Sequence, residues 1–315
     1  MRPSLLVTRR LPDRVLAALD ARFAVTLRDT PAPLTTAEAA AALAAHDAIL
    51  PTLGDGFSAA AFAAPPRARI LANFGVGYNH IDVAAARAAG VVVTNTPGAV
   101  TDATADLAVL LMLMAARRAG EGERLVRAGG WTGWQPTQML GLHVTGKTVG
   151  IVGMGRIGQA IARRCHLGFG MTVLFHTRSP VDPGVPARRV ATLAEAMAAD
   201  VVIVAVPGGP ATRHLIDAAA LAAMPAHGIL VNIARGDVVD EAALIDALER
   251  RAIGAAGLDV YEHEPAVPAA LRALDTVVLL PHLGTNALEV REQMGLMARD
   301  NLTAFFDGRA VPNAL

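Results

Sequence analysis

Residues 148–158 read TVGIVGMGRIG, and this stretch predicts both a fold and a ligand. TVGIV is typical of a buried strand, and QAIARRCHLGF, directly after the stretch, is typical of a helix. The first glycine of the GxGxxG pattern permits a tight turn, the second lets backbone approach a pyrophosphate, and the third lets the helix pack closely on the strand. The pattern predicts a dinucleotide site at Gly153, Gly155, Arg156, Ile157 and Gly158. The alternative is an ordinary glycine-rich turn between a strand and a helix.

The end of the next strand predicts which dinucleotide is bound. In such sites an Asp or Glu about 20 residues after the glycines holds the ribose 2′-hydroxyl of NAD. Here residues 173–179 read VLFHTRS and contain no acid. An acid would repel a 2′-phosphate, whereas Arg178 can pair with one and Thr177 and Ser179 can donate hydrogen bonds to it. These residues predict NADP(H); the alternative is that Arg178 is a solvated loop residue and the cofactor is NAD.

Strand-like and helix-like segments alternate along the chain, which predicts parallel sheets with right-handed helical crossovers. A helix is predicted at 36–46, with Thr35 or Thr36 as its N-cap. A last amphipathic helix, at 286–308, is expected to pack back on the first part of the chain. Two series of strands are predicted, the first at 4–8, 23–27, 47–50, 69–73 and 91–95, the second at 147–153, 171–176, 200–206, 228–233, 254–260 and 276–280.

These two series predict an α/β protein of two doubly wound parallel-sheet domains. The length of 315 residues agrees with two domains of about 150 residues each. We expect a Rossmann cofactor domain, residues 99–286, inserted in a flavodoxin-like substrate domain made of residues 1–98 and 287–315. The substrate domain would then be discontinuous in sequence.

Composition and charge argue against several classes of protein. Lys+Arg and Asp+Glu both number 28, and this zero net charge disfavours a nucleic-acid binder or a polybasic membrane anchor. The longest apolar run, 107–116, is about half of the ~20 residues that a membrane-spanning helix needs. The start of the chain has no apolar segment of signal-peptide length. The single cysteine, Cys165, cannot form an internal disulfide, so a cytoplasmic protein is expected.

Three side chains that could act in catalysis follow late strands of the second series. Arg235 follows 228–233, Glu264 follows 254–260 and His282 follows 276–280. The carboxyl ends of strands in a doubly wound sheet converge on the ligand crevice, so these residues are expected to meet there. Taken singly, each has an ordinary alternative: a surface arginine, a loop carboxylate and a loop histidine.

Together the three residues suit the reduction of a 2-keto acid. A hydride reaches the carbonyl carbon and a proton must reach the oxygen; a histidine, with an ordinary pKa near neutrality, can donate that proton. Glu264 would orient the imidazole and favour its charged form. Arg235 offers a planar fork to the carboxylate and the keto oxygen. His263 has no accompanying cluster of metal ligands, so no metal is predicted.

Four segments in this order, GMGRIGQAIARR, NIARGDVVDEAAL, GLDVYEHEP and LLPHLGTNA, resemble the D-isomer-specific 2-hydroxyacid dehydrogenase family over nearly the whole chain. The resemblance implies the roles given above to Arg235, Glu264 and His282, with Glu264 preferred to Glu262 because it directly precedes Pro265. It also implies that Val76 and Gly77, in the loop NFGVG, bind the substrate carboxylate, and Leu53 is expected to line the pocket. Further implied cofactor contacts, with Asp259 near the nicotinamide amide, are Thr104, Pro207, Ala234, Asp259 and Gly284.

Within the family, NTPGAVTDATADLAVLLML and GGWTGWQPTQMLG look most like glyoxylate/hydroxypyruvate reductases, many of which prefer NADPH. The expected reaction is reduction of glyoxylate, hydroxypyruvate or a similarly small 2-keto acid, with NADPH preferred over NADH. The family also implies a homodimer formed through the long apolar helix of the cofactor domain. Two alternatives stay open: another D-2-hydroxyacid dehydrogenase, acting on phosphoglycerate or a longer 2-keto acid, and a dinucleotide-sensing corepressor.

Overall fold

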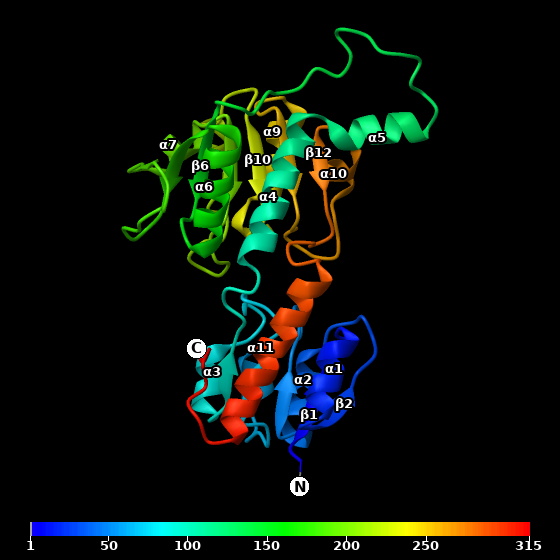
Figure 1. The fold of residues 1–315 in the computed structure, drawn as a ribbon, viewed down its shortest axis with the longest axis vertical. Helices are drawn as coiled ribbons and strands as arrows, with labels where there is room; N and C mark the ends of the chain where they lie inside the picture. Colours follow the sequence, from blue (N-terminus) through cyan, green and yellow to red (C-terminus); the bar gives the residue numbers. More distant parts are fainter. Residues whose placement is uncertain (1) are drawn as a thin grey trace. The chain divides into compact units, whose positions relative to one another are not determined.

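The computed structural model describes residues 2–315, which divide into two compact units. Unit 1 comprises residues 2–100 together with Thr285–Leu315, and unit 2 comprises Thr101–Gly284. The two ends of the chain both belong to unit 1, so unit 2 is an insertion in it (Figure 1). Each unit is built on one sheet of parallel strands, which confirms the predicted α/β fold of two parallel-sheet domains.

Unit 1 has five parallel strands in the order β2-β1-β3-β4-β5, which is the flavodoxin-like order. The strands are β1 (Ser4–Val7), β2 (Ala24–Leu27), β3 (Ala48–Leu50), β4 (Ile70–Ala72) and β5 (Val92–Thr94). The helices are α1 (Asp13–Asp20), α2 (Thr36–Ala45), the 3-10 turn η1 (Ala59–Phe62), α3 (Val83–Ala88) and α11 (Leu288–Phe306).

Local sequence explains how the helices of unit 1 begin and pack. Thr35 is the N-cap of α2: its hydroxyl accepts the Glu38 N–H at 3.2 Å, and the Glu38 carboxylate accepts the Thr35 N–H at 2.7 Å. This capping box satisfies two donors that the start of a helix leaves open, and it selects Thr35 over Thr36. The last helix, α11, runs beside α1 (Figure 1), where Arg14 pairs with Glu292.

Unit 2 has seven parallel strands in the order β12-β11-β10-β9-β6-β7-β8. The strands are β6 (Thr148–Val152), β7 (Thr172–His176), β8 (Ala187–Arg189), β9 (Val201–Val204), β10 (Ile229–Asn232), β11 (Ala255–Leu258) and β12 (Val277–Leu279). The helices are α4 (Thr101–Ala116), α5 (Ala119–Arg127), α6 (Arg156–Phe169), α7 (Leu193–Met197), α8 (Ala218–Ala222), η2 (Gly236–Val238), α9 (Glu241–Glu249) and α10 (Ala269–Ala273).

The strand order of unit 2 is that of a Rossmann fold with one strand added beyond the sixth. The chain moves from β6 outward to β8 and then returns to β9 on the other side of β6, so the order reverses between β6 and β9. Strands β9, β10 and β11 are buried throughout, as expected for a parallel sheet covered on both faces. Ligands of doubly wound sheets bind outside the carboxyl ends of the strands at such a reversal.

Strand β8 differs from the sequence-based expectation, which placed no strand at 187–189. Its residues read ARR, and both arginines are exposed, so they lack the apolar pattern on which strand prediction depends. The strand forms at the edge of the sheet, where it pairs with β7 alone. Charged side chains are typical of edge strands because they discourage pairing with another chain.

Within residues 2–315, no helix is both long and apolar enough to cross a membrane. The longest apolar run of the sequence lies in α4, where Ala108, Leu111 and Met112 are fully buried in the core of unit 2.

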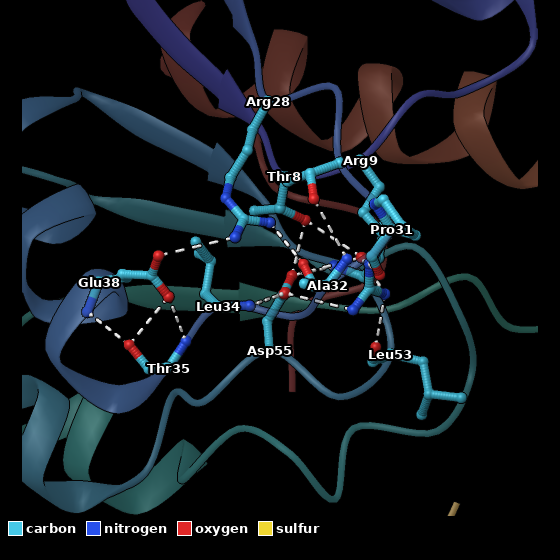
Figure 2. A network of polar contacts seen from close by, with 12 residues as sticks. Thr8, Arg9, Arg28, Pro31, Ala32, Leu34, Thr35, Glu38, Leu53 and Asp55 are labelled. Atoms are coloured by element: carbon cyan, nitrogen blue, oxygen red, sulfur yellow. Dashed lines mark hydrogen bonds and ion pairs between the residues drawn. The ribbon is translucent and has the colours of Figure 1, made fainter. Parts of the chain in front are cut away.

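A buried carboxylate organises the loops beside β1 and β3 in unit 1 (Figure 2). Asp55 is completely buried and accepts the Thr8 hydroxyl at 2.6 Å and the backbone N–H groups of Leu34 and Thr52, both at 2.8 Å. Arg9 lies 3.8 Å from Asp55 and donates to the Leu53 carbonyl at 2.7 Å. The two members of this ion pair therefore both bind backbone groups of the loop that follows β3: Asp55 accepts the Thr52 N–H and Arg9 donates to the Leu53 carbonyl.

We predict that Asp55→Ala destabilises unit 1 strongly. The substitution leaves the N–H groups of Leu34 and Thr52 buried without an acceptor and removes the short bond from the Thr8 hydroxyl, at a cost of roughly 2–5 kcal/mol. The midpoint of thermal unfolding should fall clearly below that of the wild type. Asp13→Ala is the matched control, because the Asp13 side chain is 90% exposed and its ion pair contributes little. Equal midpoints for the two variants would contradict the role given to Asp55.

Candidate active site

The turn between β6 and α6 has the geometry that a pyrophosphate-binding turn needs. Gly153 has a φ of +98°, a conformation that favours glycine, and its N–H donates to the His176 carbonyl at 2.9 Å. A Cβ on Gly158 would lie 2.1 Å from the Gly153 carbonyl oxygen, so only glycine lets α6 approach β6 this closely. The backbone geometry of this turn thus requires glycine at the first and third positions of the motif.

The start of α6 is open to an anion. Gly155 is its N-cap and makes no side-chain cap, and a Cβ on Gly155 would meet open space. Within the described chain, the N–H groups of Arg156 and Ile157 have no hydrogen-bond acceptor. Because unpaired N–H groups and the helix dipole both favour negative charge, this end of α6 fits the pyrophosphate of a dinucleotide.

The residues expected to select the cofactor follow β7 directly. Thr177 is half-buried, whereas Arg178 and Ser179 are exposed, and the stretch from 172 to 181 contains no carboxylate. A residue that the sequence did not suggest, Arg189 of β8, donates from Nη2 to the carbonyl oxygens of Thr177 at 2.9 Å and Arg178 at 3.1 Å. Arg189 is more than ten residues away from Thr177 and Arg178 in sequence, and the pairing of β7 with β8 brings it next to them.

Three neighbouring strands, β10, β11 and β12, bring together the residues expected to act in catalysis. Nδ1 of His282 lies 2.9 Å from Oε2 of Glu264, and Oε1 of Glu264 accepts the Tyr261 N–H at 3.1 Å. The His282 and Glu264 side chains are each 30% exposed, so the pair is reachable from solvent. The carboxylate thereby orients the imidazole, and Nε2 of His282 has no hydrogen-bond partner within residues 2–315.

Arg235 approaches this pair because its loop packs against the loop that carries Glu264. A Cβ on the next residue, Gly236, would lie 1.8 Å from the Tyr261 carbonyl carbon, so the contact requires glycine. Arg235 donates from Nη1 to the Ala234 carbonyl at 2.6 Å, and its Nε is buried without a hydrogen-bond partner in the described chain. An unpaired buried guanidinium N–H is costly in the free protein and is suited to an anionic ligand.

Electrostatics within the site favour an ionised Glu264. Burial raises the pKa of Glu264, but the hydrogen bond and charge of His282, the Tyr261 N–H and the charge of Arg235 outweigh burial and hold it below its ordinary value of 4.5. Burial lowers the pKa of Arg235, against the opposing charges of Glu264 and Asp237. The site thus contains an anion between two groups that can carry positive charge.

Asp259 shapes the turn on which His282 lies. It is 1% exposed, and its carboxylate accepts the N–H groups of Leu283 at 2.6 Å and Gly284 at 2.9 Å. Its backbone carbonyl accepts the His282 N–H at 2.9 Å. Burial raises the pKa of Asp259, although the two N–H groups and His282 oppose this. The cofactor contact expected of Asp259 stays a prediction; the structure shows both carboxylate oxygens bonded to the turn.

The other expected cofactor residues lie at the same edge of the sheet. The Thr104 hydroxyl donates to the Gly284 carbonyl at 3.2 Å, which joins the start of α4 to the His282 turn. Ala234 is buried and its N–H donates to the Asn232 side chain at 3.0 Å. Pro207 is exposed on the loop after β9, and its carbonyl accepts the Thr212 hydroxyl at 2.7 Å.

In unit 1, the loop with Val76 and Gly77 presents backbone donors. The Asn73 amide donates to the carbonyls of Gly75 and Gly77, both at 3.0 Å, and the Asn95 amide donates to the Val76 carbonyl at 2.9 Å. The N–H groups of Val76 and Gly77 have no acceptor within residues 2–315. Successive free N–H groups form an anion-binding concavity, as expected for a carboxylate site. Sequence reasoning included Asn73 in this loop but assigned no role to the side chain of either asparagine, although each directly follows a strand.

Leu53, the other residue expected at the substrate, lies in unit 1 on the loop held by Arg9 and is 38% exposed. As for metals, the described part of the chain contains no group of three or more His, Cys, Asp or Glu side chains that could hold an ion.

Comparison with known proteins places this site in a family. Residues 109–284 match the family described as D-isomer specific 2-hydroxyacid dehydrogenase, NAD binding domain. The chain is 41% identical over 319 residues to a glyoxylate reductase of Thermococcus onnurineus, covering 99% of this chain and 95% of that protein. The chain belongs to the D-isomer-specific 2-hydroxyacid dehydrogenase family.

Other members of the family agree with this assignment. A glyoxylate reductase of Korarchaeum cryptofilum is 41% identical over 318 residues, covering 99% of this chain and 96% of that protein. The crystal structure of an NADPH-dependent glyoxylate/hydroxypyruvate reductase from Sinorhizobium meliloti, in complex with NADP and malonate, superposes with a TM-score of 0.89 at 38% identity. That match covers 100% of this chain and 97% of the other. The family resemblance predicted from sequence is confirmed, and the chain is an NAD(P)-dependent oxidoreductase.

We predict that the stabilising effect of Glu264 depends on pH. Because the pKa of Glu264 is lowered in the folded protein, its ionised form stabilises the fold above the ordinary value of 4.5, and this stabilisation is lost as pH falls through the lowered pKa. Glu264→Gln mimics the protonated acid. The difference in thermal midpoint between wild type and Glu264→Gln should therefore be present at pH 6 and shrink on acidification below 4.5.

The matched control is Glu249→Gln, at the exposed end of α9. Its difference in thermal midpoint from the wild type is not expected to shrink on acidification. A difference between wild type and Glu264→Gln that stays constant on acidification would show that the His282 contact does not depend on the charge of Glu264.

Proposed function

We propose that this protein reduces glyoxylate, hydroxypyruvate or a similarly small 2-keto acid with NADPH, and that His282 donates the proton. The observation that carries the proposal is the His282–Glu264 pair at 2.9 Å beside Arg235, at the carboxyl edge of a dinucleotide-binding sheet. Nε of Arg235 is buried there without a partner in residues 2–315. The glyoxylate reductases to which the chain is similar over its full length support the choice of substrate class.

Each residue of the group has a distinct part in this proposal. The bound dinucleotide supplies the hydride that reaches the carbonyl carbon of the keto acid. Arg235 binds the substrate through its planar guanidinium fork, which matches a carboxylate and the adjacent keto oxygen. His282 gives a proton to that oxygen, and Glu264 holds the imidazole in place and stabilises its charged form. The free N–H groups of Val76 and Gly77 are proposed to bind the substrate carboxylate.

The same proposal assigns roles to the two units. Unit 2 is the cofactor domain, because the glycine turn and the Arg235 group both belong to it. Unit 1 is the substrate domain, because it holds Val76, Gly77 and Leu53. For the cofactor, the cation and hydroxyls of Thr177, Arg178 and Ser179 support a preference for NADPH, as does the complex of the Sinorhizobium meliloti relative with NADP.

Exposed apolar side chains on unit 2 support a homodimer. Leu110 of α4 is 45% exposed, and the segment after α5 exposes Trp131 (53%), Trp134 (79%) and Leu140 (69%). Large exposed apolar side chains that lie together are typical of a surface that a partner covers. A second copy of the chain, joined through unit 2, is the partner that the family resemblance implies.

We predict that His282→Ala lowers kcat for glyoxylate reduction by roughly 10²–10⁴-fold, the usual contribution of a general acid. The dissociation constant of NADPH, measured by fluorescence titration, should stay nearly unchanged because His282 acts on the substrate. His263→Ala is the matched control: this histidine lies next to Glu264 in sequence but is exposed and outside the group. If His282→Ala keeps most of the wild-type kcat, His282 is not the proton donor.

We predict that Arg178→Ala lowers kcat/KM with NADPH by about 10- to 150-fold and leaves NADH nearly unaffected. The estimate follows from the loss of a charge-assisted hydrogen bond to the 2′-phosphate, worth roughly 1.5–3 kcal/mol. Thr177→Asp should go further, because its carboxylate repels the phosphate and accepts from the ribose hydroxyls. Steady-state kinetics with both reduced nicotinamides check this. Equal losses with both cofactors, or a wild type that does not discriminate, would rule out the proposed preference.

A further inference from the structure

We infer that Arg189 is a positioning residue that shapes the backbone of the 2′-phosphate site; this inference rests on the proposed preference for NADPH. Arg189 is the last residue of β8, an edge strand whose register places Arg189 beside Phe175 of β7. One nitrogen of its guanidinium, Nη2, donates to two successive backbone carbonyls, those of Thr177 and Arg178. These are the first residues after β7, where the cofactor-selecting side chains begin.

The two carbonyl contacts determine the direction of the neighbouring N–H groups. In a trans peptide the C=O of one residue and the N–H of the next point to opposite sides, and both peptides concerned are trans. Because the Thr177 and Arg178 carbonyls face Arg189, the N–H groups of Arg178 and Ser179 point away from Arg189. Neither N–H has an acceptor within residues 2–315. Two successive free N–H groups directed to one side are an anion-binding arrangement of the backbone.

The sheet order indicates which side these N–H groups face. Strand β7 lies between β6 and β8, so the loop that Arg189 contacts from β8 has β6 on its other flank. The carboxyl end of β6 leads into the glycine turn that fits the pyrophosphate. The 2′-phosphate of a dinucleotide bound at that turn would thus meet backbone donors, and the Arg178 side chain would add its charge. By binding both carbonyl oxygens, Arg189 also keeps these two peptides from turning over and presenting a carbonyl to the phosphate.

The adjacent residue provides a matched control. Arg188 precedes Arg189 in β8, and successive strand residues point to opposite faces of the sheet. Arg188 is exposed like Arg189, but its side chain makes no hydrogen bond or ion pair within the described chain, and only its backbone pairs with β7. Removing either arginine removes one positive charge from β8, so a difference between the two variants isolates the carbonyl contacts from the general electrostatic attraction.

The test is calorimetric titration of adenosine 2′,5′-bisphosphate and of AMP, which differ by the 2′-phosphate, into the wild type and the variants. Arg189→Ala should weaken binding of the bisphosphate by about five- to tenfold, in the range of the hydrogen bonds it lacks, and change AMP binding by less than about twofold. Arg189→Lys should restore part of the affinity, and Arg188→Ala should change the affinity for either ligand by less than about twofold. Circular dichroism and thermal midpoints identify any variant that fails to fold.

A double variant separates positioning from direct contact. If Arg189 acts through the loop that carries Arg178, the combined loss in Arg178→Ala/Arg189→Ala should be clearly smaller than the product of the two single losses. Multiplicative losses would overturn the positioning role. So would equal effects of Arg188→Ala and Arg189→Ala in a wild type that prefers the bisphosphate. A wild type that binds the bisphosphate no better than AMP would instead remove the proposed NADPH preference, and this inference with it.

Discussion

The group proposed for catalysis depends on one buried carboxylate, that of Asp259, whose two oxygens both accept backbone N–H groups. Asp259 accepts two backbone N–H groups of the turn after β12, and the bond to Leu283 is short, at 2.6 Å. These bonds hold His282 at a φ of +55°, a conformation that costs a residue other than glycine roughly 1–3 kcal/mol. Bonds between N–H groups and an ionised carboxylate are among the strongest in proteins and can offset that cost. From this turn the His282 ring reaches Glu264, which in turn accepts the Tyr261 N–H.

A second feature recurs at several places in the molecule. Side-chain donors bind backbone carbonyls and leave the neighbouring N–H groups without acceptors. Asn73 and Asn95 do this for the loop with Val76, and Arg189 does it for the loop after β7. A parallel sheet leaves the backbone at the carboxyl ends of its strands unpaired, so some other group must determine its direction. Because these loops expose N–H groups rather than carbonyls, both are suited to anions, as the substrates and cofactor of this family require.

Local sequence patterns were sufficient for much of this structure. The apolar runs predicted the strands of both sheets, because residues buried on two faces must be apolar. The glycine motif predicted the turn after β6, since the positive φ of Gly153 and the close approach of Gly158 to Gly153 are both local in sequence. Arg235, Glu264 and His282 could be picked out because each follows a strand in a fold whose strand ends converge. Strand β8, by contrast, had no apolar signal, because an edge strand beside a single neighbour needs little burial.

The sequence by itself determined the α/β class and the dinucleotide turn, and it indicated which residues are proposed for catalysis, because their signals are periodicity, glycine spacing and position after a strand. Only the tertiary structure decided how those residues are oriented. The 2.9 Å contact of His282 with Glu264 and the bond from Arg189 to Thr177 join residues on or after different strands. The same packing buries Nε of Arg235 without a partner in the described chain. The direction of a side chain or a peptide depends on what packs against it, and those neighbours are distant in sequence.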